Sequence, residues 1–236
     1  MVFCNWCPPG FPGSQGLDLF TDLPVLSRTL TLIKHVKLRK QNTLLLTEIK
    51  SAARKEAKLH RRRIHDKIGY EASQQISGYI EKFLQERTKF NVIAAYLPIN
   101  TELDLRPTIR KLRLLGKKIC LPLIISSNSP LQFKIWEEDT KLAIGKFDVM
   151  VPTSEESVEP DLILCPMLSF DLEGFRLGYG GGFYDRTIEH LSERKLIFTM
   201  GCGYSQQLSL KLIPKGKYDK SLDAAVTERG ITLFKK

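Results

Sequence analysis

The sequence lacks any run of about eighteen apolar residues, which is roughly what a membrane-spanning helix requires. The longest candidate, residues 26–32, is interrupted by Arg28 and two threonines, so we expect no membrane segment. The basic residues from Arg28 to Lys40 follow this weakly apolar stretch, whereas a secretory signal carries its positive charges first. Secretion is therefore not expected. An organellar transit peptide and a start codon assigned too early both stay open.

Cysteine and histidine are also scarce, with five and four residues. Three cysteines, Cys120, Cys165 and Cys202, lie in apolar, strand-like runs. The odd count in a chain of this size indicates no disulfide framework, and we expect a reducing cytoplasm. Cys4 and Cys7 have the spacing of half a zinc site, but no second pair of ligands follows. We interpret these two as thiols without a metal, and Cys165 as inert packing.

The composition is otherwise that of a globular protein. A chain of 236 residues with 42% hydrophobic residues is long enough for one substantial α/β domain with a buried core. The net charge of +10 favours a polyanionic partner, whether nucleic acid, anionic lipid or a phosphate-rich small molecule. Charge alone does not choose among them.

Residues 1–43 differ from the remainder. A Pro/Gly cluster at residues 8–13 precedes a basic stretch with no sustained hydrophobic period. This pattern predicts a poorly structured N-terminal tail over residues 1–43. The compact domain is predicted to span residues 44–236.

The first helix of this domain is predicted to begin near Thr47, which can cap it, and to run from 48 to 64. Lys50, Arg54 and Lys58 recur at four-residue spacing, so one face of this helix is strongly basic. A second helix, with an apolar stripe, is predicted over residues 71–86.

Beyond residue 89 short apolar runs alternate with helical ones. This rhythm predicts a single three-layer α/β domain, in which a mostly parallel, Rossmann-like sheet is flanked by helices. The predicted strands are residues 92–97, 119–123, 132–136, 162–165 and 196–202, and the predicted helices are residues 105–115 and 183–191.

The most informative segment for function is residues 162–186. A buried strand is followed by a loop with Arg176, and residues 178–182, Gly-Tyr-Gly-Gly-Gly, lead into a helix. A glycine-rich turn at the carboxyl end of a strand lets backbone N–H groups approach a phosphate. Arg176 adds a permanent charge there and, as a loop residue, is expected to contribute little to stability. Asp185 places a carboxylate where a magnesium ion could bridge to phosphates.

The same residues also allow a plain structural interpretation, a flexible turn before a helix whose first acid complements the helix dipole. Neither common nucleotide signature is present. Phe183 replaces the third glycine of G-x-G-x-x-G, and no G-x-x-x-x-G-K-[ST] occurs. From these residues alone, phosphate binding and a plain turn stay equally open.

A longer pattern resembles a known family. The signature consists of Pro-Met-Leu-Ser-Phe-Asp at residues 166–171, Gly174, and Arg-Leu-Gly-Tyr-Gly-Gly-Gly-Phe-Tyr-Asp-Arg at residues 176–186. It is similar to that of the 5-formyltetrahydrofolate cyclo-ligase family. Further pieces match in the same order, namely Lys50, Arg54, Tyr96-Leu97-Pro98, Glu102, Gly116-Lys117-Lys118, Pro122, Asp219, Asp223 and Val226-Thr227-Glu228. The resemblance covers about residues 44–236.

The resemblance implies an ATP-dependent ligase that converts 5-formyltetrahydrofolate to 5,10-methenyltetrahydrofolate, with ATP as co-substrate and Mg²⁺ as cofactor. It implies two catalytic residues, Arg176 and Tyr184, folate contacts at Leu97, Glu102 and Tyr179, and metal ligands at Asp185 and Asp223. The implied ATP contacts are Lys50, Arg54, Arg176, Leu177, Gly178, Tyr179, Gly180, Gly181, Gly182, Phe183 and Tyr184. A lysine that some members carry in this loop is Gly181 here.

On this basis we expect small-molecule partners, no membrane association and a cytoplasmic monomer. Two alternatives stay open. The basic helix could serve a nucleic-acid-binding protein, although no RNA-binding module with stacking aromatics is recognisable. A sugar-phosphate or acyl enzyme on a similar scaffold would bind phosphate and leave ATP untouched.

Overall fold

The computed structural model describes residues 23–146 and 149–235. Its first element, α1 (Leu23–Gln85), is a single helix of 63 residues. Of the predicted tail, residues 1–22, with Cys4 and Cys7, lie outside the described residues, and residues 23–43 are helical. The chain divides into two compact units, the second of which begins at Leu46. The description below concerns this second unit.

The helix α1 runs through the point where the sequence predicted two helices separated by residues 65–70. Its described residues on both sides of Gly69 bury the same face, since Ile64 and Ala72 are both in the core. Ser73 donates a hydrogen bond from Oγ to the carbonyl oxygen of Gly69 over 2.8 Å. Good helix formers on either side and a common buried face outweigh the low helix propensity of one glycine.

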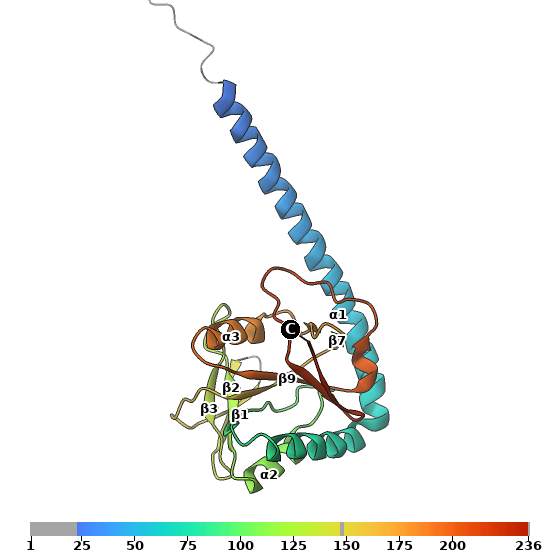
Figure 1. Cartoon of the computed structure of the whole chain (residues 1–236), viewed down its shortest axis with the longest axis vertical. Coiled ribbons are helices and arrows are strands. Elements are labelled where there is room, and N and C mark those ends of the chain that lie inside the picture. The colour runs from blue at the N-terminus through green and yellow to red at the C-terminus, as the bar shows by residue number, and fades with distance from the viewer. Residues whose placement is uncertain (1–22, 147–148, 236) are drawn as a thin grey trace, which may run out of the picture. The chain divides into compact units, whose positions relative to one another are not determined.

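A seven-stranded sheet forms the centre of this unit (Figure 1). Its strand order is β12-β11-β9-β6-β1-β2-β3. The five inner strands are parallel, and the two edge strands β12 and β3 run antiparallel to their neighbours. The strands are β1 (Val92–Ala94), β2 (Lys118–Leu123), β3 (Gln132–Ile135), β6 (Leu162–Pro166), β9 (Phe198–Cys202), β11 (Ala224–Thr227) and β12 (Gly230–Leu233).

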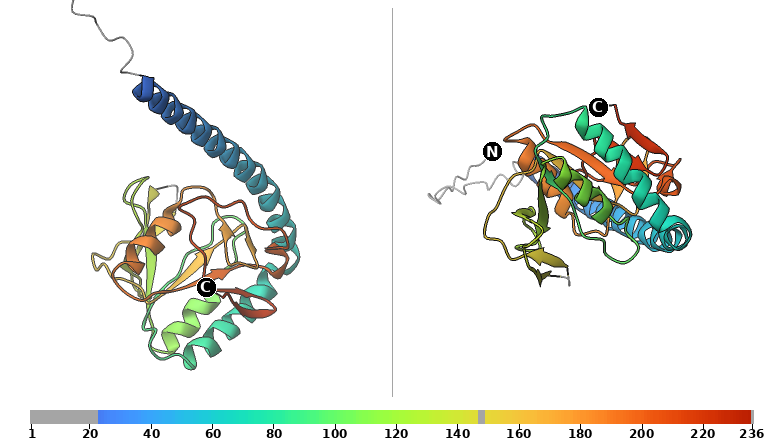
Figure 2. Two further views of the ribbon diagram at one scale, coloured as in Figure 1. Left: turned by 45° about the horizontal axis from the view of Figure 1, so that its top comes forward. Right: turned by 90° about the horizontal axis from the view of Figure 1, so that it is seen from below.

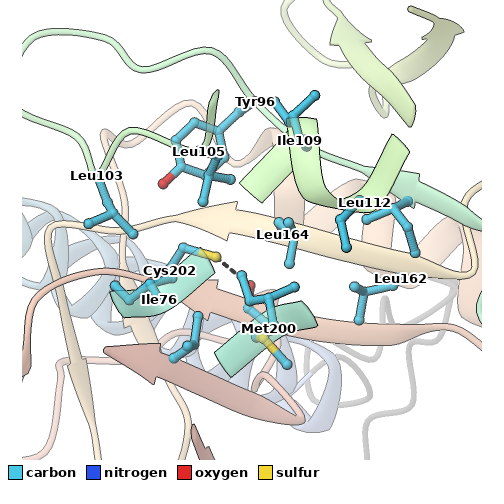
Figure 3. Close-up of a cluster of buried hydrophobic side chains, with 14 of the residues drawn as sticks. Ile76, Tyr96, Leu103, Leu105, Ile109, Leu112, Leu162, Leu164, Met200 and Cys202 are labelled. Carbon is cyan, nitrogen blue, oxygen red and sulfur yellow. Dashed lines mark hydrogen bonds between the residues drawn. The ribbon is translucent and has the colours of Figure 1, made fainter. Parts of the chain in front are cut away.

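Helices cover both faces of the sheet, as predicted. The C-terminal part of α1 and α2 (Arg106–Leu114) lie side by side on one face (Figure 2). Ile76, Ile109 and Leu164 belong to the core cluster between these helices and the sheet (Figure 3). On the other face α3 (Phe183–Ser192) buries Ile188 against a second cluster. The three-layer α/β architecture is thus confirmed.

Smaller elements stand beside the main sheet. A three-stranded sheet contains β7 (Ser169–Asp171), β8 (Arg176–Leu177) and β10 (Leu208–Ser209), and a two-stranded sheet contains β4 (Leu142–Ile144) and β5 (Met150–Pro152). The carboxylate of Asp171 shapes the turn between β7 and β8. Its Oδ1 accepts hydrogen bonds from the backbone N–H groups of Glu173 and Phe175, both over 3.0 Å. Gly174 completes the turn with a φ of +82°.

Candidate active site

The direction in which the strands are added reverses between β1 and β6. From β1 the chain proceeds to β2 and β3 on one side, and from β6 to β9 and β11 on the other. The crevice beyond the carboxyl ends of two such strands is where open α/β sheets bind ligands. A cavity of about 710 Å³ opens here, lined by Leu97 after β1 and by Pro166 at the end of β6. Its volume is typical of a small-molecule site.

This pocket brings together the predicted ATP and folate residues. Lys50, Arg54, Leu97, Glu102, residues 176–184 and Asp185 all line it. Asp223 is not among its lining residues. Residues from three separate parts of the described chain therefore meet in one cavity.

The glycine loop, residues 178–182, forms one wall between β8 and α3. Gly180 has a φ of +105°, and a Cβ at this position would lie 3.1 Å from Cζ of Arg54. Gly182 precedes α3 with a φ of +66°. Arginines hold both ends of the loop: Arg54 donates from Nε to the carbonyl oxygen of Gly178 over 3.0 Å. Arg186 donates from Nη2 to the carbonyl oxygen of Gly181 over 2.8 Å. The loop is held open at the N-terminus of α3, where helices attract anions.

The basic face of α1 forms a second wall. Lys50, Arg54 and Lys58 all line the pocket. Nζ of Lys50 lies 2.5 Å from Oδ2 of Asp219, an acid that the sequence had given no role. The prediction that these basic side chains share one face agrees with their common position on the pocket wall.

Arg176 and Asp185 form an ion pair at the base of the glycine loop. Nη2 of Arg176 donates to Oδ1 of Asp185 over 3.1 Å, and Nη1 donates to the carbonyl oxygen of Lys220 over 3.1 Å. The backbone N–H of Lys220 donates to the same Oδ1, and neither contact engages Oδ2 of Asp185. The Arg176 side chain is only 4% exposed. This burial argues for a contribution of Arg176 to stability, unlike the expectation for a loop residue, because a buried arginine must keep its partners.

Glu102 lines the pocket from the loop after β1 and is only 3% exposed. Its Oε2 accepts a hydrogen bond from the backbone N–H of Ile99 over 2.9 Å. Burial raises the pKa of this carboxyl to about 7, although the Ile99 N–H, Arg61 and the Tyr179 hydroxyl each lower it. Glu102 is thus an acid that titrates near neutral pH inside the pocket.

Two tyrosines also line the pocket, Tyr96 after β1 and Tyr184 in the first turn of α3. Burial raises the pKa of both phenols, so both stay neutral hydroxyl groups at physiological pH. The Tyr96 hydroxyl is buried and has no hydrogen-bond partner among the described residues. Burial also raises the pKa of Cys165 to about 12, in keeping with a packing role for this thiol.

Arg61 is a central residue that the sequence analysis missed. It is on α1, is 2% exposed, and its Nη2 donates to the Tyr179 hydroxyl over 2.5 Å. The signal was present, since Arg61 continues the row Lys50, Arg54 and Lys58 at helical spacing. The neighbouring Arg62 and Arg63 fall outside this row and are exposed.

Asp223 lies at the junction of β9 and β11. Its Oδ2 accepts hydrogen bonds from the backbone N–H and from Oγ1 of Thr199, both over 2.7 Å. Within the described ranges no group of three or more His, Cys, Asp or Glu side chains could hold a metal ion. Of the two predicted metal ligands, Asp185 thus lines the pocket, whereas Asp223 is hydrogen-bonded to Thr199 outside its lining.

The fold and the pocket define an α/β enzyme scaffold with its ligand site at the carboxyl edge of a parallel sheet. The model of the 5-formyltetrahydrofolate cyclo-ligase family matches residues 46–228. The chain therefore belongs to the 5-formyltetrahydrofolate cyclo-ligase family, whose members are ligases of folate metabolism with ATP as co-substrate.

Named relatives agree with this assignment. The 5-formyltetrahydrofolate cyclo-ligase of Escherichia coli K12 is 32% identical over 144 residues, which cover 58% of this chain and 78% of that protein. The protein of the same name from Haemophilus influenzae is 28% identical, over 65% of this chain and 83% of that one. The nucleic-acid-binding and sugar-phosphate or acyl-enzyme alternatives are not supported by these relatives.

Solved structures agree as well. The 5,10-methenyltetrahydrofolate synthetase of Aquifex aeolicus is 31% identical, with a TM-score of 0.63 over 80% of this chain and 94% of that chain. A synthetase of the same name from Mycoplasma pneumoniae, 23% identical, shares the fold with a TM-score of 0.61 over 76% and 98% of the two chains. Within the described residues, no helix has the length and apolarity that a membrane crossing requires.

Proposed function

We propose that this protein converts 5-formyltetrahydrofolate to 5,10-methenyltetrahydrofolate in the pocket at the carboxyl ends of β1 and β6. The formyl oxygen attacks the γ-phosphorus of ATP and ADP leaves. The N10 amine then attacks the activated carbon, loses its proton, and inorganic phosphate departs with the former formyl oxygen. The observation that carries the proposal is the convergence of the glycine loop, Arg54 and Arg176 on one pocket that also contains Glu102.

The residue types suit this chemistry. Phosphoryl transfer needs positioning and neutralisation of charge more than a covalent protein nucleophile. Lys50, Arg54 and Arg176, with the glycine loop, line the pocket and supply cationic side chains and backbone N–H groups. Leu97, Glu102 and Tyr179 supply an apolar contact, an acid and an aromatic ring for the folate.

The direct test is absorbance at the methenyl-folate band after mixing the protein with Mg²⁺, ATP and 5-formyltetrahydrofolate. We expect a rise that requires ATP, with one ADP released per methenyl product. A folded protein that gives no rise, or a rise that is equal without ATP, would refute the proposed function.

Magnesium is part of the proposal. Mg²⁺ is usually held by one or two carboxylates together with substrate phosphates. The Asp185 carboxylate fits, because it lines the pocket, is 24% exposed, and does not use Oδ2 in its contacts with Arg176 and Lys220. The ion would neutralise charge on the transferred phosphoryl group. Asp223 fits less readily, since Oδ2 accepts two hydrogen bonds from Thr199.

Asp185→Asn is expected to raise the Mg²⁺ concentration for half-maximal rate by roughly 10-fold or more, because an amide oxygen is a weaker ligand for a hard cation. Initial rates over a magnesium titration measure this. Glu189→Gln, one turn further along α3 and 46% exposed, is the matched control and should leave the titration unchanged. If Asp185→Asn leaves the magnesium titration unchanged, Asp185 is not a metal ligand. The same titration with Asp223→Asn tests whether Asp223 is one.

We also propose that the protein acts as a cytoplasmic monomer on small-molecule substrates. Three free cysteines in the described part of the chain, Cys120, Cys165 and Cys202, are buried, which suits a reducing compartment. Light scattering at assay concentrations tests the monomer.

A further inference from the structure

Arg61 is a buried cation whose partners come from three separate loops. Its side chain is 2% exposed, and an arginine this deep in a protein requires hydrogen-bond partners. Nε donates to Oγ1 of Thr101 over 3.2 Å, in the loop after β1. Nη1 donates to the carbonyl oxygen of Met167 over 3.2 Å, in the segment after β6. Nη2 donates to the Tyr179 hydroxyl over 2.5 Å, in the glycine loop.

Arg61 faces Glu102 directly, as a buried ion pair, and also contacts the Tyr179 hydroxyl beside it. Nη1 of Arg61 lies 4.0 Å from Oε1 of Glu102, which is too long for a hydrogen bond. The Tyr179 hydroxyl accepts a hydrogen bond from Nη2 of Arg61, and its interaction with Glu102 lowers the pKa of that carboxyl. The hydroxyl thus lies between the guanidinium and the carboxylate.

Two cationic side chains, Lys58 and Arg61, also lie over the Tyr179 ring. Cζ of Arg61 lies 5.5 Å and Nζ of Lys58 lies 5.0 Å from the ring centroid. Both are within reach of a cation–π interaction. The ring is 42% exposed and lines the pocket, so it is the part of Tyr179 that a ligand can contact.

We propose that Arg61 is a positioning residue for the folate half of the site, which holds Glu102 and the Tyr179 ring in their working orientation through the Tyr179 hydroxyl. This inference rests on the proposed function, in which Glu102 and Tyr179 contact the folate. Arg61 itself lies beneath these two residues and is not among those that line the pocket. It acts through its neighbours.

The arrangement predicts a selective kinetic effect. The ATP half of the site uses Arg54, Arg176 and Asp185, none of which appears among the contacts described for Arg61. Tyr179 is the member of the implied ATP set that Arg61 contacts. Loss of Arg61 should therefore raise the KM for 5-formyltetrahydrofolate by more than the KM for ATP. A residue that only stabilised the fold would change the amount of active enzyme, and so kcat, with both KM values unchanged.

A second effect follows from charge. The groups facing Glu102 are Arg61 from α1, Tyr179 from the glycine loop, Tyr96 after β1 and Tyr184 from α3. Arg61 is the cation of this set. Its replacement should shift the acid limb of the folate kcat/KM profile to higher pH.

The experiment compares Arg61→Gln, Tyr179→Phe and the double variant. Tyr179→Phe keeps the ring and removes the hydroxyl link, so it tests the proposal even where Arg61→Gln does not fold. We expect each single variant to raise the folate KM by roughly 10-fold, the cost of losing a hydrogen bond to a charged group. The double variant should be little worse than either, since both interrupt the same link. Arg62→Gln, at an exposed neighbouring position, should match the unmodified protein.

The proposal would be overturned by a folded Arg61→Gln, or a Tyr179→Phe, whose folate KM stays within about 2-fold, or by equal rises in both KM values. Titration of 5-formyltetrahydrofolate without ATP, followed by the quenching of protein fluorescence, separates this failure from that of the proposed function. If the unmodified protein binds folate but does not turn over, the proposed reaction fails, and the variants' folate affinities still decide the role of Arg61. If it binds no folate, both fail.

Discussion

Arg176→Ala is expected to lower kcat/KM by on the order of 100- to 1,000-fold, as the loss of one fixed donor to a developing charge does in other enzymes. The contacts with Asp185 and with the Lys220 carbonyl fix the guanidinium before any substrate arrives. Its charge therefore has a fixed position in the lining of the pocket. Steady-state rates with ATP and folate varied in turn measure the loss.

The same variant is expected to be less stable, by about 2–4 kcal/mol, because it leaves the Asp185 carboxylate and the Lys220 carbonyl without their buried partner. Urea unfolding gives this cost. Arg176→Lys separates the two effects, since lysine keeps the positive charge but cannot make the paired hydrogen bonds of a guanidinium. The lysine variant should be more stable to unfolding than the alanine variant, and its kcat/KM should still be well below that of the unmodified protein. A folded alanine variant with normal turnover would contradict the role of Arg176.

Glu102→Gln is expected to weaken folate binding while it stabilises the protein above neutral pH. Burial raises the pKa of Glu102 from 4.5 to about 7, so folding favours the protonated carboxyl. Between these two values the native state holds a proton that the unfolded chain has lost. The free energy of unfolding therefore falls as pH rises through this window and is constant above it.

Glutamine mimics the neutral acid and removes this dependence. At about pH 8 the variant should be more stable than the unmodified protein by up to about 3 kcal/mol, and at about pH 4 the two should agree. The loss of the negative charge facing Arg61 offsets part of the gain. Urea unfolding at both pH values, with the folate KM, tests this. Equal stability differences at both pH values would show that Glu102 does not titrate in this range.

The sequence predicted β1, β2, β6 and β9 because each is a buried apolar run, and it predicted α3 because the glycine loop marks its beginning. It missed β8 and β10, which have two residues each, since no periodicity can appear over that length. The hairpin of β11 and β12 was missed too, although Gly230, with a φ of +126°, supplied a turn signal.

In the candidate site, too, local patterns were predicted and long-range contacts were not. Lys50, Arg54 and the glycine loop were found because each belongs to a local pattern. The contact of Arg61 with Tyr179 joins residues 118 positions apart, and only the packing of α1 against the loop reveals it. The burial that shifts the pKa of Glu102 is likewise invisible in a loop that reads as exposed.

One helix, α1, supplies both the row Lys50, Arg54 and Lys58 to the pocket and Ile76 and Ile80 to the core. Each residue of an α-helix advances by about 100° around the axis. A one-residue insertion or deletion between residues 61 and 64 would therefore leave the core residues of α1 in register and rotate Lys50, Arg54 and Lys58 by about 100° relative to the pocket. The spacing within α1 between the pocket and the core can therefore change only by whole turns if both sets of side chains are to keep their positions.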